Sequence, residues 1–141
     1  MGHIAKGMVA GFIATVVLSI IMVIKAFVHL LPEFNAIELV HNLTGGPVLL
    51  GWVGHFVIGT VLWGTLFALL YRWLPGASSI AKALAFSVLA WLAMMLLFMP
   101  LSGGGFFGLA IGLPVIVATL VLHLVWGFVL GLAYGRQPQR R

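Results

Sequence analysis

The amino-acid sequence predicts an all-α membrane protein whose four transmembrane helices form a compact bundle. Of its 141 residues, 63% are hydrophobic, and the mean hydropathy is +1.24. Only 6% are charged, whereas a soluble domain carries about 25%. Small residues also recur every fourth position inside the apolar stretches, and this spacing lets helix backbones approach closely in a bilayer.

The first predicted span covers residues 7–30. From Gly7 to Ile24 the chain carries no charge, and about 20 apolar residues cross a bilayer core. The run continues beyond Lys25 without the small-x-small cleavage site of a secretory signal peptide. We therefore expect an uncleaved helix, one face of which carries four small residues at four-residue spacing: Gly7, Gly11, Thr15 and Ser19.

A short amphipathic helix is predicted in the first outer loop. Pro32 and Glu33 resemble the start of a helix, and Gly45 with Gly46 marks its end. The segment between them is too short to span, so we expect it to lie on the membrane surface.

The second and third spans are predicted at residues 47–72 and 82–99. Pro47 opens the second and Pro100 stops the third. The second span has two small-residue ladders at four-residue spacing, which contain Gly51, His55, Gly59 and Thr60, Gly64, Ala68 respectively. We expect these faces, and Gly59 and Gly64 in particular, to pack against other helices.

The fourth span is predicted at residues 106–134, and residues 136–141 form a basic cytoplasmic tail. One helical face carries a small or weakly polar residue at every fourth position: Thr119, His123, Gly127, Gly131 and Gly135. Gly127 and Gly131 are therefore expected in a helix seam, where Thr119 and His123 would supply hydrogen bonds.

Basic residues predict the orientation of the four spans. One side would hold six of them: Lys6, Arg72, Lys82, Arg136, Arg140 and Arg141. The other side would hold Lys25 alone. The positive-inside rule then places both termini in the cytoplasm.

The spans also resemble two tandem hairpins. Trp63-Gly64 with Tyr71 matches Trp126-Gly127 with Tyr134 at equal separations. A rival register aligns His55 and Gly59 with His123 and Gly127, and the sequence leaves both open. Hairpins of equal orientation would be related by an axis along the membrane normal.

Several function classes are disfavoured by what the chain lacks. It has no Asp and no Cys, and its two carboxylates are Glu33 and Glu38. Paired-carboxylate hydrolysis, thiolate chemistry and carboxylate proton relays are therefore not expected. The basic residues are scattered at span ends, so we expect the lipid bilayer, not nucleic acid, as the partner of this surface.

His55 and His123 are the ionisable side chains predicted inside the hydrocarbon. In the first interpretation they are structural, neutral and hydrogen-bonded to backbone or to hydroxyls such as Thr15 or Ser19. In the second they are axial ligands of haem b. Their depths, counted at 1.5 Å per residue from the basic ends, differ by about one turn.

The third interpretation is a soft-metal or Cu(I) site near the outer face. Its candidate ligands are three histidines and three methionines, namely His29, His41, His55, Met94, Met95 and Met99. Methionine in an apolar span is more often packing material.

Several stretches resemble a bacterial family of small four-span inner-membrane proteins of unknown function. They are Lys6-Gly-Met-Val-Ala-Gly-Phe-Ile-Ala-Thr-Val-Val-Leu-Ser19, Gly51-Trp-Val-Gly-His-Phe-Val-Ile-Gly59 with Trp63-Gly64, and Trp91 with Met94-Met95 and Met99-Pro100. The resemblance implies four helices in a bacterial inner membrane and implies no activity.

We therefore expect a non-enzymatic accessory or interaction subunit without a cofactor. It would be a homo-oligomer or part of a larger membrane complex. The alternatives are a haem- or metal-binding protein that uses His55 and His123, and an oligomeric transporter or pore for small solutes.

Overall fold

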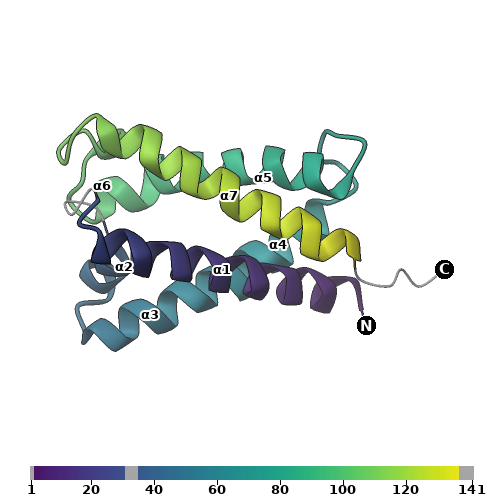
Figure 1. Ribbon diagram of the computed structural model, residues 1–141, viewed down its shortest axis with the longest axis horizontal. Helices are drawn as coiled ribbons and strands as arrows, with labels where there is room; N and C mark the ends of the chain where they lie inside the picture. The colour runs from purple at the N-terminus through teal and green to yellow at the C-terminus, as the bar shows by residue number, and fades with distance from the viewer. Residues whose placement is uncertain (1, 31–34, 137–141) are drawn as a thin grey trace.

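The computed structural model describes residues 2–30 and 35–136, and within them it shows an all-helical bundle (Figure 1). Four helices are long and apolar enough to cross a membrane: His3–Phe27, Val48–Leu70, Ser79–Leu101 and Leu113–Arg136. The predicted fold class is confirmed. Glu33 and residues 137–141 of the predicted tail lie outside the described residues.

The first two helices form the first span and part of the loop that follows it. Helix α1 runs over His3–Phe27 and α2 over Ala36–Thr44. The Asn35 side chain caps α2 by accepting a hydrogen bond from the Ile37 N–H, and Gly45 ends the helix in the left-handed conformation. The short helix predicted in the first loop is therefore present, with Asn35 as its N-cap.

The second and third long helices each contain a π-helical turn. The second consists of α3 (Val48–Val57), η1 (Ile58–Trp63) and α4 (Gly64–Leu70). The third consists of α5 (Ser79–Ala93), η2 (Met94–Phe98) and α6 (Met99–Leu101). A π turn inserts an extra residue into the helical repeat and is frequent at functional sites.

The fourth long helix, α7, covers Pro114–Arg136, whereas the sequence placed the start of the span near Phe106. The preceding segment holds only the short 3₁₀ helix η3, Phe106–Gly108. Gly103, Gly105, Gly108 and Gly112 in this region all have positive φ, and such backbone cannot continue an α-helix. Hydropathy alone does not reveal this interruption.

Close backbone approach joins the helices in pairs. A Cβ atom added to Gly11 of α1 would lie 2.6 Å from the Gly59 carbonyl oxygen. One added to Gly127 of α7 would lie 2.5 Å from Ser87 Cβ of α5, and one on Gly131 would lie 2.5 Å from Ile80 Cα. Helix α1 therefore packs against η1 and α4, and α7 packs against α5 (Figure 1).

A core of aromatic and small side chains fills the space between these pairs. It includes ten buried residues: Ala10, Ala14, Phe67, Ala68, Leu74, Ala83, Phe86, Trp126, Leu130 and Tyr134. Large apolar side chains also cover the outside of the bundle, and Ile20, Leu97 and Val117 are 55%, 59% and 66% exposed. An apolar exterior over apolar spans belongs to a multi-pass membrane protein.

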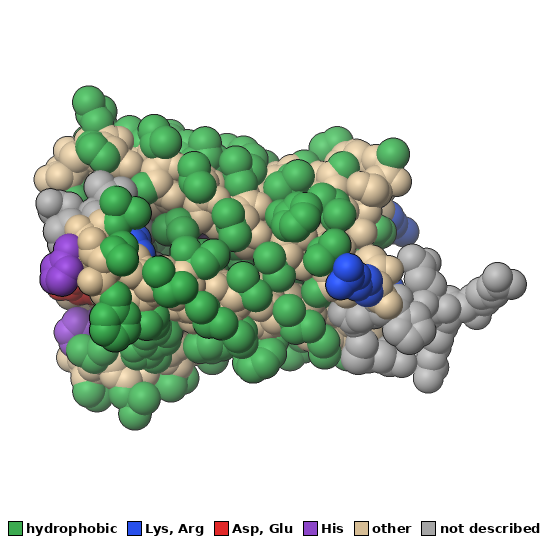
Figure 2. Space-filling model, viewed as in Figure 1, with side chains coloured by type: hydrophobic (Ala, Val, Ile, Leu, Met, Phe, Trp, Pro, Cys, Tyr) green, Lys and Arg blue, Asp and Glu red, His purple; other side chains and the backbone are tan. Residues whose placement is uncertain are grey.

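The two ends of the bundle differ in charge. Lys and Arg side chains lie at the end that carries both termini, and His and acidic side chains lie at the opposite end, where the last turn of α1 carries Lys25 (Figure 2).

Contacts at the terminal end follow one of the two predicted repeat registers. The Lys6 ammonium lies 4.6 Å from the centroid of the Tyr134 ring. In the other half, the Lys82 ammonium lies 5.0 Å from the centroid of the Tyr71 ring. Each lysine therefore contacts the tyrosine of the other hairpin. This pairing matches the register that aligns Tyr71 with Tyr134, in which Thr60, not His55, corresponds to His123.

Candidate functional site

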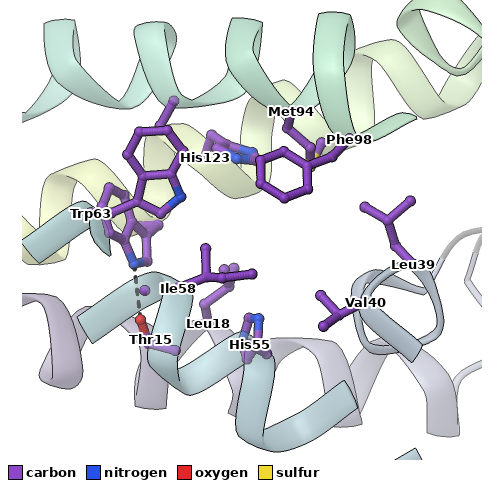
Figure 3. A pocket seen from close by; sticks show the side chains of 13 residues that line it. Thr15, Leu18, Leu39, Val40, His55, Ile58, Trp63, Met94, Phe98 and His123 are labelled. Atoms are coloured by element: carbon purple, nitrogen blue, oxygen red, sulfur yellow. Dashed lines mark hydrogen bonds between the residues drawn. The ribbon is translucent and has the colours of Figure 1, made fainter. Parts of the chain in front are cut away.

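A cavity of about 100 Å³ lies between the helix pairs. Polar and aromatic side chains from all four long helices line it: Thr15, His55, Trp63, Phe98, His123 and Trp126. The remaining wall is apolar: Leu18, Leu39, Val40, Ile58, Gly59, Ala90 and Met94. In Figure 3, Trp63, His123, Met94 and Phe98 lie across the open space from Thr15, Ile58 and His55. None of these side chains is a carboxylate.

His55 reaches the cavity from α3 and is tied to α1. The Ser19 hydroxyl donates to the Thr15 carbonyl oxygen at 2.7 Å. Because that bond uses its only proton, Ser19 Oγ accepts the hydrogen bond from His55 Nε2, at 3.2 Å. The hydrogen therefore sits on Nε2, and Nδ1 of His55 keeps a free lone pair.

His123 reaches the same cavity from α7. Its Nδ1 atom lies 2.8 Å from the Thr119 carbonyl oxygen. A carbonyl oxygen only accepts, so Nδ1 carries the hydrogen. The lone pair of His123 is thereby on Nε2, which has no hydrogen-bond partner among the described residues.

Two tryptophan–threonine hydrogen bonds hold the helices around the cavity. The indole N–H of Trp126 donates to Thr15 Oγ1 at 3.3 Å. The indole N–H of Trp91 donates to Thr119 Oγ1 at 3.0 Å. The Thr119 hydroxyl donates in turn to the Val115 carbonyl oxygen at 2.6 Å. Interhelical bonds of this kind fix the position of α7 relative to α1 and α5.

Both π turns border the cavity. Ile58, Gly59 and Trp63 of η1 line it, as do Met94 and Phe98 of η2. The extra residue in each turn changes the face that the following residues present. The cavity therefore lies where two of the four long helices depart from regular α geometry.

Helix α2 contributes Leu39 and Val40 to the wall at the end opposite the termini (Figure 3). It packs closely on α3, because a Cβ atom on Gly51 would lie 2.6 Å from the Ile37 carbonyl oxygen. One on Gly54 would lie 2.6 Å from Val40 Cγ1. Helix α2 is therefore part of the bundle.

The structure brings some predicted site residues together and separates others. His55, His123, Met94, Thr15 and Gly59 border one cavity, and Ser19 bonds His55. Met95 and Met99 lie instead in a second buried cluster with Val115. The remaining packing glycines, Gly7, Gly11, Gly64, Gly127 and Gly131, lie in helix contacts outside the cavity wall.

The other two candidate metal-binding histidines do not reach the cavity wall. His29 is exposed at the end of α1, at a positive φ of 53°. His41 lies on α2, and its buried Nδ1 atom has no hydrogen-bond partner in the part of the chain that the structure describes.

The cavity is small for haem. A cavity of about 150 Å³ holds one benzene ring, and this one measures about 100 Å³. A haem macrocycle between His55 and His123 would require the surrounding helices to separate. His55 and His123, the predicted candidates for axial haem ligands, therefore share a cavity that fits a ligand much smaller than haem.

The sequence did not predict the aromatic part of the wall or the part that α2 contributes. Trp63 and Trp126 were not among the predicted site residues, although an indole N–H inside a bilayer needs a hydrogen-bond acceptor. That requirement was a usable signal for the Trp126 contact with Thr15. No comparable signal marked Leu39, Val40 or the two π turns.

The sequence model of one protein family matches residues 1–141, and it describes a family of unknown function, DUF6789. This whole-chain match confirms the expectation of a family without an assigned function. No curated protein and no solved structure gives a significant match.

Proposed function

The chain belongs to DUF6789, a family of unknown function, and we propose that it is a non-enzymatic accessory membrane protein that holds one small ligand between His55 and His123. The observation that carries this proposal is the pair of free imidazole lone pairs at one cavity. Hydrogen bonds fix which nitrogen is free in each ring. A pair of merely structural histidines would have no reason to keep a nitrogen available at the same space.

The apolar surroundings strengthen this assignment. Polar groups inside a membrane protein are costly unless they are satisfied, and those that persist mark ligand or transport sites. The cavity wall combines the two imidazoles with the aromatic rings of Trp63, Trp126 and Phe98. A few directed polar groups on an apolar, aromatic wall are typical of small-ligand sites.

We place the protein in a bacterial inner membrane with both termini in the cytoplasm. The charge difference between the ends supports this orientation. Lys6 near the start of α1, Arg72 and Lys82 beside the turn between α4 and α5, and Arg136 at the end of α7 all belong to the end that carries both termini (Figure 1). The cavity then lies in the outer half of the bilayer, and α2 covers it on the outer side. The bilayer is the first partner, and the accessory role implies a homo-oligomer or a larger membrane complex.

Mass spectrometry of protein purified in nanodiscs tests the proposal. We expect wild-type protein to carry one additional small species, which is lost in His123→Ala and retained in Met95→Leu, whose site lies outside the cavity. An absorption spectrum of the same sample tests haem directly through a Soret band. Wild-type protein that carries no additional species and takes none up from a membrane extract would contradict ligand binding.

A further inference from the structure

We propose that the ligand is a small uncharged molecule of the urea type, which donates hydrogen bonds from two opposite ends and accepts one between them. This inference rests on the proposed function, because it names the chemical class of the molecule held between His55 and His123. Its protein partners are the free nitrogens of these two rings and the indole N–H of Trp63. All three residues line the cavity.

Two of these nitrogens can only accept a hydrogen bond. The hydrogen of His55 lies on Nε2, which donates to Ser19 Oγ at 3.2 Å. The hydrogen of His123 lies on Nδ1, which donates to the Thr119 carbonyl oxygen at 2.8 Å. His55 Nδ1 and His123 Nε2 therefore carry no hydrogen in the neutral rings. A ligand that pairs with both rings has to supply two N–H or O–H donors.

The third nitrogen can only donate. The indole N–H groups of Trp91 and Trp126 donate to threonine hydroxyls, whereas that of Trp63 donates to no residue in the part of the chain that the structure describes. An indole N–H inside a bilayer needs an acceptor. A ligand that pairs with Trp63 has to supply one acceptor atom besides its two donors.

All three nitrogens are open to a ligand. Within residues 2–30 and 35–136, the enclosed side-chain polar atoms without a partner are His41 Nδ1 and Thr60 Oγ1. The unpartnered nitrogens of His55, His123 and Trp63 do not belong to this group, so each of them keeps accessible surface. Because all three residues line the cavity, it offers a ligand two acceptors and one donor.

The placement of the two imidazoles favours a molecule with a donor at each end. His55 lies on one side of the open space, and His123 lies across it (Figure 3). A molecule with donors at opposite ends can reach both rings at once, as a single ion cannot. Urea has this pattern, because an amino group stands on either side of one carbonyl oxygen.

The wall of the cavity favours an uncharged ligand. It contains no Asp, Glu, Lys or Arg side chain, and a charged molecule in such apolar surroundings would have no compensating charge. The aromatic rings of Trp63, Trp126 and Phe98 also belong to the wall. Their faces suit a planar, rigid molecule, which loses little conformational freedom when it binds.

The volume of the cavity limits the ligand to a few atoms. A cavity of about 150 Å³ holds one benzene ring. The volume of about 100 Å³ found here has room for about two thirds as many non-hydrogen atoms, roughly four. Urea is of this size. Hydrogen-bonding pattern, charge and volume therefore favour the same class of molecule.

Equilibrium dialysis of isotope-labelled ligands against protein in nanodiscs tests the inference, with empty nanodiscs as the blank. Urea, acetamide, acetone and guanidinium are planar and similar in size. Acetamide keeps one amino group of urea, acetone keeps neither, and guanidinium adds a positive charge. Each is titrated into the millimolar range, because a ligand of so few atoms binds weakly even at best. We expect one urea per chain, acetamide binding about 10-fold weaker, and no saturable binding of acetone or guanidinium.

Two substitutions test the partners on the wall. His123→Phe keeps a flat ring but removes the acceptor, and it should abolish saturable urea binding. Trp63→Phe removes the indole donor and should weaken urea binding about 10-fold. Trp52→Phe is the matched control, because Trp52 lies outside the cavity wall, and it should bind urea like the wild type. Thermal melting identifies a variant that has lost its fold, and the remaining one then decides.

Other outcomes overturn the inference in distinguishable ways. Equal binding of urea and acetone would refute the two donors, and equal binding of urea and guanidinium would refute the uncharged class. Urea binding that survives both His123→Phe and Trp63→Phe would place the molecule elsewhere. Wild-type protein that binds no urea but carries a species lost in His123→Ala would refute the class and leave the proposed function intact. Absence of both would refute the class and the proposed function together.

Discussion

The indole N–H of Trp126 on α7 donates to the hydroxyl oxygen of Thr15 on α1, at 3.3 Å. The Thr15 carbonyl oxygen accepts the Ser19 hydroxyl, which in turn accepts from His55. One residue of α1 therefore links α7 to the histidine on α3. Because Thr15 and Trp126 both line the cavity, helix packing and the candidate site depend on the same contact.

Replacement of Trp126 by Phe should destabilise the bundle. The ring remains to fill the core, but the hydrogen bond to Thr15 is lost. Interhelical hydrogen bonds in membranes contribute about 0.6 kcal/mol on average and up to about 1.7, so we expect a loss in that range. Reversible unfolding in mixed detergent measures it. Trp52→Phe is the control, because the indole N–H of Trp52 donates to no residue within 2–30 or 35–136. An equal loss there would contradict our assignment.

Substitution of Gly64 by Ala should be more damaging than its small size suggests. The added Cβ would lie 2.7 Å from the Gly7 carbonyl oxygen and 3.0 Å from Met8 Cα. Both are backbone atoms, so α1 and α4 must move apart. Overpacking of this kind costs about 1–3 kcal/mol. Gly2→Ala, which meets no atom within 4 Å, should leave the unfolding free energy unchanged; similar losses in both variants would argue against a tight seam.

The absence of native Cys makes the proposed orientation simple to measure. Asn42 and Ala77 are both exposed, in α2 and in the turn before α5 respectively. In intact bacterial spheroplasts, a membrane-impermeant maleimide should label Asn42→Cys and reach Ala77→Cys only after permeabilisation. The reverse pattern would place the termini outside.

Ser19→Ala should weaken ligand binding although Ser19 does not line the cavity. Without the Ser19 oxygen, His55 Nε2–H loses its acceptor, and the orientation of the ring is no longer fixed. We expect the fraction of protein that carries the ligand to fall, which mass spectrometry in nanodiscs would measure. Ser19→Thr keeps the hydroxyl and should restore binding. If both variants bind like the wild type, Ser19 does not position His55.

Composition and small-residue spacing were sufficient to predict the bundle. Apolar runs of spanning length predict four helices whatever their neighbours, and a bilayer leaves glycine faces few uses other than close packing. The start of α7 was harder to predict, because the glycines between Gly103 and Gly112 interrupt the helix through backbone conformation while the segment stays apolar.

That His55 and His123 share one cavity was harder to predict for a related reason. Counting residues at a fixed α-helical rise from Arg72 and Arg136 put His55 and His123 about one turn apart in depth. The η1 turn, Ile58–Trp63, lies between His55 and Arg72 and packs more residues into each turn. The count therefore overstated the distance of His55 from the basic end.

The extra residue in η1 keeps His55 and the following half of the helix facing the cavity together. The six residues Ile58–Trp63 turn the chain about as far as five residues of an α-helix would. Deleting one of the residues between Gly59 and Trp63 would therefore restore ordinary α-helix and leave His55 facing the cavity. The same six residues in α-helical geometry would turn the chain about 100° further, and His55 would then face away from the cavity.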